Sequence, residues 1–292
     1  MKKIWLILFS LIILSSCERQ SISEVSKELR IITVGSKATE IIYELGLGES
    51  IVARDYHSLY PSSVSKLPEL GFAHSINLES FITHKPTHLV IWDEIGTYKK
   101  LIEKSAHAGI SVLELSPNPG VVELRQSIQD AGKLFSREEQ ASALLQKVTE
   151  DLKRVSDYID AKKLDGKGLF IFAKGMGTML AAGQKTDADE FMGLVGLETA
   201  INGFNDYKAI NAEIVIEANP KYLLMVHVGL ESIGGINQLK NIPGLSKTTA
   251  FKENNIITMD KVCMEFGPRI GQFALEFAKK LHGDIPALQK EN

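Results

Sequence analysis

The sequence predicts an α/β protein in which two Rossmann-like lobes are joined by a single long α-helix, with a ligand cleft between the lobes. Short apolar runs alternate with helical segments in both halves of the chain, which is the pattern of parallel sheets. Residues 77–86 recur as residues 211–220, with Asn, Glu and Pro each repeated 134 positions later. An uninterrupted helical pattern over 136–161 separates the two halves. Two similar lobes would enclose a cleft, where small ligands usually bind.

Residues 30–135 are predicted to form the N-terminal lobe. Apolar, β-branched runs predict strands over 30–34, 51–54, 89–92 and 111–115. Helices are expected over 39–45, 78–83, 98–108 and 121–135. This order of strand and helix implies a parallel sheet.

The connecting helix is predicted over residues 136–163. Ser136 followed three residues later by Glu139 is a capping-box pattern. Apolar residues then recur every three or four positions, and the opposite face is charged. About 25 residues of helix span about 38 Å, so we expect a rigid spacer, in contrast to a Gly/Ser-rich linker.

Residues 164–286 are predicted to form the C-terminal lobe. Strands are expected over 169–173, 222–226 and 255–259, and helices over 187–194, 213–218 and 270–281. The Gly-rich segment 174–177 follows the first of these strands, but it matches neither the dinucleotide fingerprint nor the P-loop. A nucleotide site is therefore not expected.

Residues 1–17 are predicted to be a lipoprotein signal peptide. Two lysines precede an apolar run over 4–14 that is too short for a comfortable membrane span. Small residues stand directly before Cys17, as in a bacterial lipobox, where the cysteine becomes the lipidated first residue of the mature chain. The polar residues 18–29 would form a tether. We expect an exported protein held by its lipid alone, in the periplasm or on the outer face of the cytoplasmic membrane; an ordinary signal peptide with an incidental cysteine is the alternative.

Composition argues against several classes of protein. The formal net charge is −3 and no basic stripe is present, so nucleic acid is not an expected partner. Cys263 is the only other cysteine, so lipidation of Cys17 would leave no disulfide. The chain has no Gly-x-Ser-x-Gly elbow, metal-spaced cluster or nucleotide fingerprint. An enzyme is therefore not expected, and an exported hydrolase or metal-dependent reductase stays a distant alternative.

A set of short motifs occurs in a fixed order along the chain. They lie at Asp55–Pro61, Leu67–Phe72, Ala181–Asp187, Ile242–Leu245 and Phe266–Arg269. With the fold, they resemble the periplasmic binding proteins of ABC importers that join their lobes by one long helix, a group of siderophore, cobalamin and haem carriers. The haem carriers are the most similar, over roughly residues 30 to 283. The resemblance implies a monomeric carrier that binds haem and delivers it to a permease dimer in the membrane.

The resemblance also implies roles for four residues. Tyr60 matches the tyrosine that ligates haem iron, and tyrosinate is a known axial haem ligand. A free phenol has a pKa of about 10, and ferric iron and a nearby cation both favour its charged form. Glu79 and Glu213 match glutamates that dock onto arginines of the permease. Arg269 is placed at the cleft as a partner for a haem propionate or for the tyrosine phenolate.

Five further residues are candidate ligand contacts. Tyr56 and His57 share the loop of Tyr60, where either is a neighbour or a substitute ligand. His74 is a candidate for a hydrogen bond to a propionate or for a second iron ligand. Met176 offers apolar contact to a porphyrin, and His227 ends a predicted strand, where open α/β sheets place ligand contacts. Ordinary packing is the alternative for each.

Three departures from the haem carriers leave the ligand open. Phe72 stands where a tyrosine is common, His74 stands where a cation is common, and residues 262–265 are less apolar than usual. They put the propionate contacts in doubt and leave Tyr60 untouched. The nearest alternative is the same fold carrying cobalamin or a ferric siderophore, and another is a haem-sensing lipoprotein without a permease.

Overall fold

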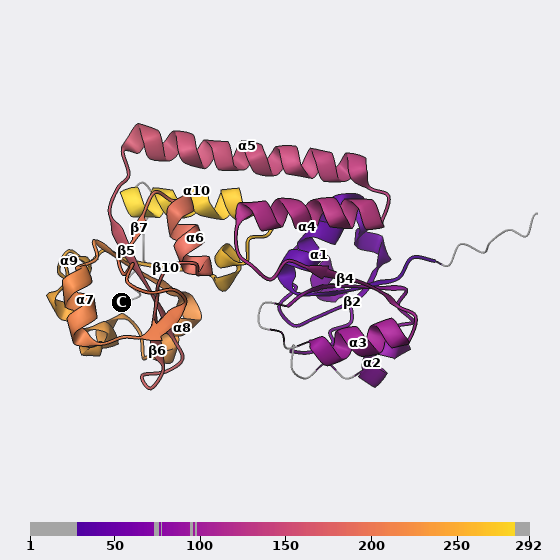
Figure 1. Cartoon of the computed structure of the whole chain (residues 1–292), viewed down its shortest axis with the longest axis horizontal. Helices are drawn as coiled ribbons and strands as arrows, with labels where there is room; N and C mark the ends of the chain where they lie inside the picture. Colours follow the sequence, from indigo (N-terminus) through magenta and orange to yellow (C-terminus); the bar gives the residue numbers. More distant parts are fainter. Residues whose placement is uncertain (1–27, 73–75, 77, 94–95, 97, 284–292) are drawn as a thin grey trace, which may run out of the picture.

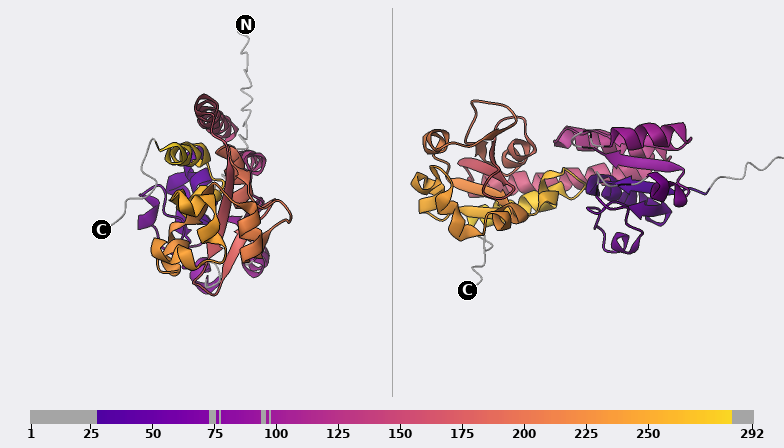
Figure 2. Two further views of the ribbon diagram at one scale, coloured as in Figure 1. Left: turned by 90° about the vertical axis from the view of Figure 1, so that its left-hand side faces the viewer. Right: turned by 90° about the horizontal axis from the view of Figure 1, so that it is seen from below.

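The molecule consists of two α/β lobes that lie end to end under one long helix (Figures 1 and 2). The computed structural model describes residues 28–283 except 73–75, 77, 94–95 and 97. Cys17 and His74 lie outside the described residues. The predicted two-lobed α/β fold is confirmed.

The N-terminal lobe is built on a four-stranded parallel sheet in the order β2-β1-β3-β4. Its strands are β1 Ile31–Val34, β2 Ile51–Arg54, β3 His88–Trp92 and β4 Ser111–Leu115. Its helices are α1 Ser36–Ile42, extended by a π-helical turn over Tyr43–Leu47, α2 Leu78–Thr83, α3 Lys99–His107 and α4 Val121–Leu134. Every residue of β1 is buried, as an interior parallel strand requires.

The connecting helix α5 runs from Glu138 to Lys162 and has 25 residues. The capping box predicted at Ser136 is wrong, because Arg137 occupies the N-cap and no side chain caps the helix. Ser136 has a φ of 52° and lies in the left-handed region that ends α4. The same residue therefore closes one helix and cannot cap the next.

The C-terminal lobe has a mixed sheet in the order β10-β9-β5-β6-β8, with β7 paired to β5. Its strands are β5 Lys167–Ala173, β6 Met179–Ala182, β7 Glu198–Thr199, β8 Tyr207–Ala209, β9 Tyr222–Val226 and β10 Ile256–Met259. Its helices are α6 Asp187–Leu194, α7 Ala212–Ala218, α8 His227–Ser232, α9 Thr249–Lys252 and α10 Ile270–His282. The sequence did not predict β6 and β8, which pair antiparallel beside β5.

The sequence repeat is a structural repeat. Helices α2 and α7 begin 134 positions apart, at Leu78 and Ala212, and strands β3 and β9 begin at His88 and Tyr222. Both units end their helix with a positive φ, 49° at Lys85 and 36° at Asn219. The same helix–strand unit therefore occurs once in each lobe.

The lobes share one apolar core beneath α5. A single buried cluster joins Ile41 of the N-terminal lobe, Val148 of α5 and Phe191 of the C-terminal lobe. Helix α10 packs against α5, and a Cβ atom added to Gly271 would lie 2.6 Å from the Cβ of Asp151. This close approach requires glycine, and it makes the junction broader than a single connecting helix.

Candidate functional site

Tyr60 lies on a loop that a buried aspartate holds in place. The loop follows β2, and Asp55 is buried at its start. One carboxylate oxygen of Asp55 accepts hydrogen bonds from the backbone N–H of Gly35, at 3.0 Å, and from the Ser58 hydroxyl. The other accepts the backbone N–H of His57 at 3.2 Å. A fully partnered buried carboxylate gives the loop one defined conformation.

Apolar side chains gather on this loop and face solvent. Tyr56 stacks on Phe72 with ring centroids 4.2 Å apart, and His57 meets both rings edge-on. Tyr56, Phe72 and Leu59 are exposed, and Tyr60 is 39% exposed. An exposed cluster of this kind marks a binding surface more often than a folding requirement.

Arg269 connects the Tyr60 loop to the start of α10. Its guanidinium carbon is 3.6 Å from the centroid of the Tyr60 ring. Its Nε lies 3.1 Å from Oε2 of Glu40, and Nη2 donates to Oε1 of the same carboxylate. Arg269 therefore forms a bidentate ion pair with Glu40 and stacks on Tyr60 at the same time.

Glu40 is 2% exposed, although it is charged. Burial raises the pKa of Glu40, and the hydrogen bond and charge of Arg269 oppose that rise. The pair spans 229 positions of sequence. No local pattern in the sequence indicated a role for Glu40.

A second buried charge lies at the junction of the lobes. Lys37 is 1% exposed, and its Nζ is 3.4 Å from the carbonyl oxygen of Ser116 and 5.7 Å from the Trp92 ring. Burial lowers the pKa of Lys37 to about 8, and the charges of Glu123 and Glu265 partly offset this. Glu265 accepts a hydrogen bond from Ser36 and so ties α1 to the C-terminal half of the chain. The sequence analysis also missed these residues.

The candidates of the C-terminal lobe lie at the carboxyl ends of its strands. Met176 is exposed in the turn between β5 and β6, and Phe172, the residue before the last in β5, is also exposed. His227 is exposed and is the first residue of α8, directly after β9, whereas it was expected to end that strand. The structure brings Tyr60 and Arg269 together, and Tyr56 with His57. Met176 and His227 belong to the other lobe.

Glu79 and Glu213 occupy equivalent positions in the two lobes. Each is exposed in the first turn of its helix, α2 or α7. The helix dipole favours a carboxylate there. In α7 the side chain of Asn211 caps the helix by accepting the backbone N–H of Ile214 at 2.9 Å.

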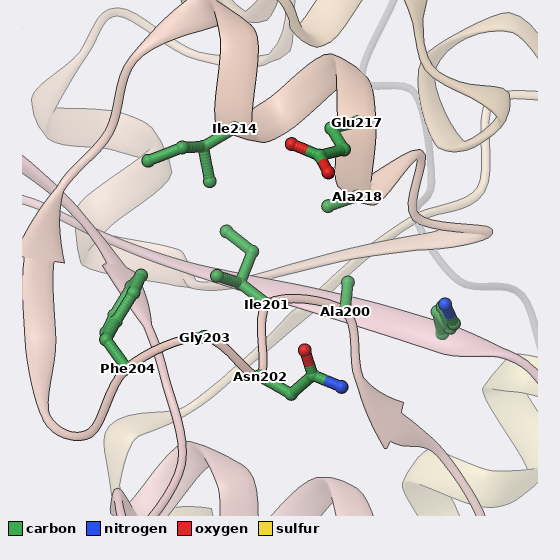
Figure 3. Close-up of a pocket in the computed structure, with 9 residues that line it drawn as sticks. Ala200, Ile201, Asn202, Gly203, Phe204, Ile214, Glu217 and Ala218 are labelled. Atoms are coloured by element: carbon green, nitrogen blue, oxygen red, sulfur yellow. The ribbon is translucent and has the colours of Figure 1, made fainter.

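A cavity of about 390 Å³ opens on the surface of the C-terminal lobe, away from Tyr60. Figure 3 shows Ile214 and Glu217 of α7 facing Ile201 across it, with Asn202 at its edge. All its lining residues come from the C-terminal lobe: Lys167, Ala200, Ile201, Asn202, Gly203, Phe204, Ile214, Glu217 and Ala218. It is therefore distinct from the surface that carries Tyr60 and Arg269.

Two further features are defined for the described residues only. In that part of the chain, no three His, Cys, Asp or Glu side chains are grouped so that they could hold a metal ion. Among the helices between residues 28 and 283 that the structure describes, none has the length and hydropathy needed to cross a membrane.

Residues 31–263 match the family model described as periplasmic binding protein. The lipoprotein YvrC of Bacillus subtilis, an uncharacterized ABC transporter substrate-binding protein, is 22% identical over 274 residues, which cover 93% of this chain and 85% of that protein. A vitamin B12-binding protein of Pectobacterium carotovorum is 24% identical over 67% of this chain and 70% of its own length. The periplasmic heme-binding protein RhuT of Roseiflexus sp. RS-1, in its apo form, superposes with a TM-score of 0.81 at 26% identity, covering 88% of this chain and 98% of RhuT.

Proposed function

Because this chain belongs to the periplasmic binding protein family, we propose that it captures haem between its lobes and hands it to an ABC permease in the membrane. The family consists of solute carriers that deliver a ligand to a permease, so the chain is a carrier and not an enzyme. The likeness to the haem carrier RhuT supports haem as the ligand.

The observation that carries the proposal is Tyr60 with Arg269 stacked on its ring. The phenol is 39% exposed, so an iron atom has access to its oxygen. The guanidinium of Arg269, 3.6 Å from the ring centroid, places a positive charge over the ring of the phenol that would become an anionic ligand. An anionic oxygen ligand suits ferric iron, and a carrier must hold oxidised haem without reacting with it.

The exposed side chains around Tyr60 suit a flat apolar ligand. Tyr56, Leu59 and Phe72 would cover one part of the porphyrin from the N-terminal lobe. Met176 and Phe172, exposed on the other lobe, would cover another. Candidate partners for the propionates or the iron are then His57, His74 and His227. The guanidinium of Arg269 is a candidate partner for a propionate or for the Tyr60 phenolate.

Delivery would use the two glutamates. Glu79 and Glu213 are exposed, one on each lobe, and we infer that each docks onto a cation of one permease subunit. Cys17, as the lipidated residue, would keep the carrier, a monomer, close to the membrane.

The experiment is a haemin titration of the chain without residues 1–17, followed by absorbance, for the natural sequence, Tyr60→Phe and Tyr56→Phe. Tyr56→Phe is the matched control, because it removes a hydroxyl from the same loop. We expect a saturable spectrum of tyrosinate-ligated ferric haem that is lost only in Tyr60→Phe. Binding that survives in Tyr60→Phe would move the iron ligand to another residue.

Cobalamin is the second candidate, because a vitamin B12-binding protein is among the similar proteins. Cobalamin needs no phenolate ligand, so its binding should not depend on Tyr60. A cyanocobalamin titration of the same variants separates the two ligands.

A further inference from the structure

Helix α1 reaches Tyr60 through two neighbouring side chains. The hydroxyl of Thr39 lies 2.6 Å from the hydroxyl of Ser58, in the loop that carries Tyr60. The next residue, Glu40, reaches the Tyr60 ring through Arg269, because its carboxylate binds the guanidinium that stacks on that ring. Both contacts come from one turn of one helix, so α1 positions the loop and the cation together.

Three side chains fix the guanidinium of Arg269. Its central carbon lies 3.6 Å from the ring centroid of Tyr60 and 4.7 Å from that of Phe273, one turn further along α10. Glu40 occupies the edge formed by Nε and Nη2. A planar guanidinium held by a carboxylate at two nitrogens keeps one orientation. Because the side chain is 18% exposed, the guanidinium could turn towards solvent if Glu40 did not hold it.

A role in folding alone does not account for the charge of Glu40. Its side chain is 2% exposed, and a buried ion pair is often no more stabilising than an apolar contact of the same size. The ion pair can do what an apolar contact cannot, because it holds a cation on Tyr60 and offsets the charge of that cation. Charged and hydrogen-bonding groups behind a metal ligand tune the oxidation state of the metal.

We propose that Glu40 is a positioning residue of the iron site, which fixes Arg269 over the Tyr60 ring and offsets its charge so that the carried haem stays ferric. An uncompensated guanidinium would withdraw electron density from the phenolate and favour the one additional electron of ferrous haem. The carboxylate opposes both effects. The role of Tyr60 as the iron ligand rests on the proposed function.

The test is a reductive titration, with dithionite, of haem bound to the chain without residues 1–17, followed by absorbance at one mildly alkaline pH that keeps Glu40 ionised. This chain retains every residue of both lobes and of α5. Glu40→Gln keeps the shape of the side chain and removes its charge, whereas Glu40→Asp keeps the charge and removes one methylene. Glu44→Gln is the matched control, because Glu44 lies one turn later and pairs with Lys147 of α5, 3.1 Å away.

We expect Glu40→Gln to lower the ratio of ferric to ferrous haem affinity about tenfold, which raises the midpoint potential by about 59 mV. Glu40→Asp should shift the potential much less, and Glu44→Gln should not shift it. A role in packing alone predicts the opposite order, because glutamine fills the space of glutamate and aspartate does not. An unchanged or lower potential in Glu40→Gln, or a larger shift in Glu40→Asp, would overturn the proposal.

A second variant keeps the test decisive if Glu40→Gln does not fold. Arg269→Gln added to Glu40→Gln removes both charges and leaves two amides that can hydrogen-bond to each other. Because the natural pair is close to neutral, the double variant should have the midpoint potential of the natural chain. A shifted potential in the double variant would contradict the offset of charge.

The spectrum of the natural chain separates this proposal from the function on which it rests. If haemin gives no tyrosinate spectrum with the natural chain, the assignment of Tyr60 fails and the role of Glu40 fails with it. If the natural chain gives that spectrum and the potentials follow the order expected from packing, the haem carrier stands and only the role of Glu40 fails.

Discussion

The two lobes share one strand order but differ in the loops that follow the corresponding strands β2 and β7. In the N-terminal lobe β1 lies between β2 and β3, and in the C-terminal lobe β5 lies between β7 and β9, all in parallel pairs. Strand β2 leads into the loop of Tyr60, whereas β7 has only two residues and leads into the loop that lines the C-terminal cavity. The helix–strand units with Glu79 and Glu213 are alike. The lobes are thus similar where a symmetric partner would bind and different where an asymmetric ligand would bind.

The largest effect is expected where the lobes are joined by a charge pair. Arg269→Ala would leave the buried carboxylate of Glu40 unpaired, which should lower the free energy of unfolding by roughly 3 to 5 kcal/mol. Thermal unfolding of the ligand-free chain measures this. The control is Lys153→Ala, which removes an exposed ion pair with Asp157 on α5 and should cost less than about 1 kcal/mol. Equal losses in the two variants would show that the Glu40–Arg269 pair does not hold the lobes together.

The next effect concerns Lys37 and depends on pH. Its pKa in the folded chain, about 8, lies below the ordinary value of 10.5, so the unfolded chain binds the extra proton between these values. The penalty for burying the charge is therefore complete below pH 8 and disappears as the pH rises towards 10.5. The free energy of unfolding of the natural chain, minus that of Lys37→Met, should rise by roughly 3 kcal/mol across this window. Denaturant unfolding of both chains at each pH measures this difference. A flat difference would mean that Lys37 titrates normally.

How much the sequence predicted depended on the range of the interactions. The helix–strand order, the long helix and the repeat follow local patterns, and all of them appear in the structure. Glu40 and Lys37 escaped notice because their partners lie far away in the sequence, at Arg269 and Ser116. The capping box predicted at Ser136 was wrong because a residue suited to cap a helix can also end the helix before it.

The smallest effect tests which lobe contributes more apolar contact to the porphyrin. Phe72 stacks on Tyr56 beside Tyr60, so Phe72→Ala should weaken haemin binding about fivefold. Met176 lies in a turn of the other lobe, and Met176→Ala should weaken it about twofold. Haemin titrations of both variants measure the two losses. A larger loss for Met176→Ala would assign the main apolar contact to the C-terminal lobe.

The most direct test of the central claim is a comparison of two ligands. The chain without residues 1–17 is titrated with haemin and, separately, with cyanocobalamin, and the binding of each is followed by absorbance. The account predicts saturable haemin binding with a tyrosinate spectrum and no saturable binding of cyanocobalamin. Saturable cyanocobalamin binding without haemin binding would contradict it and make the chain a cobalamin carrier.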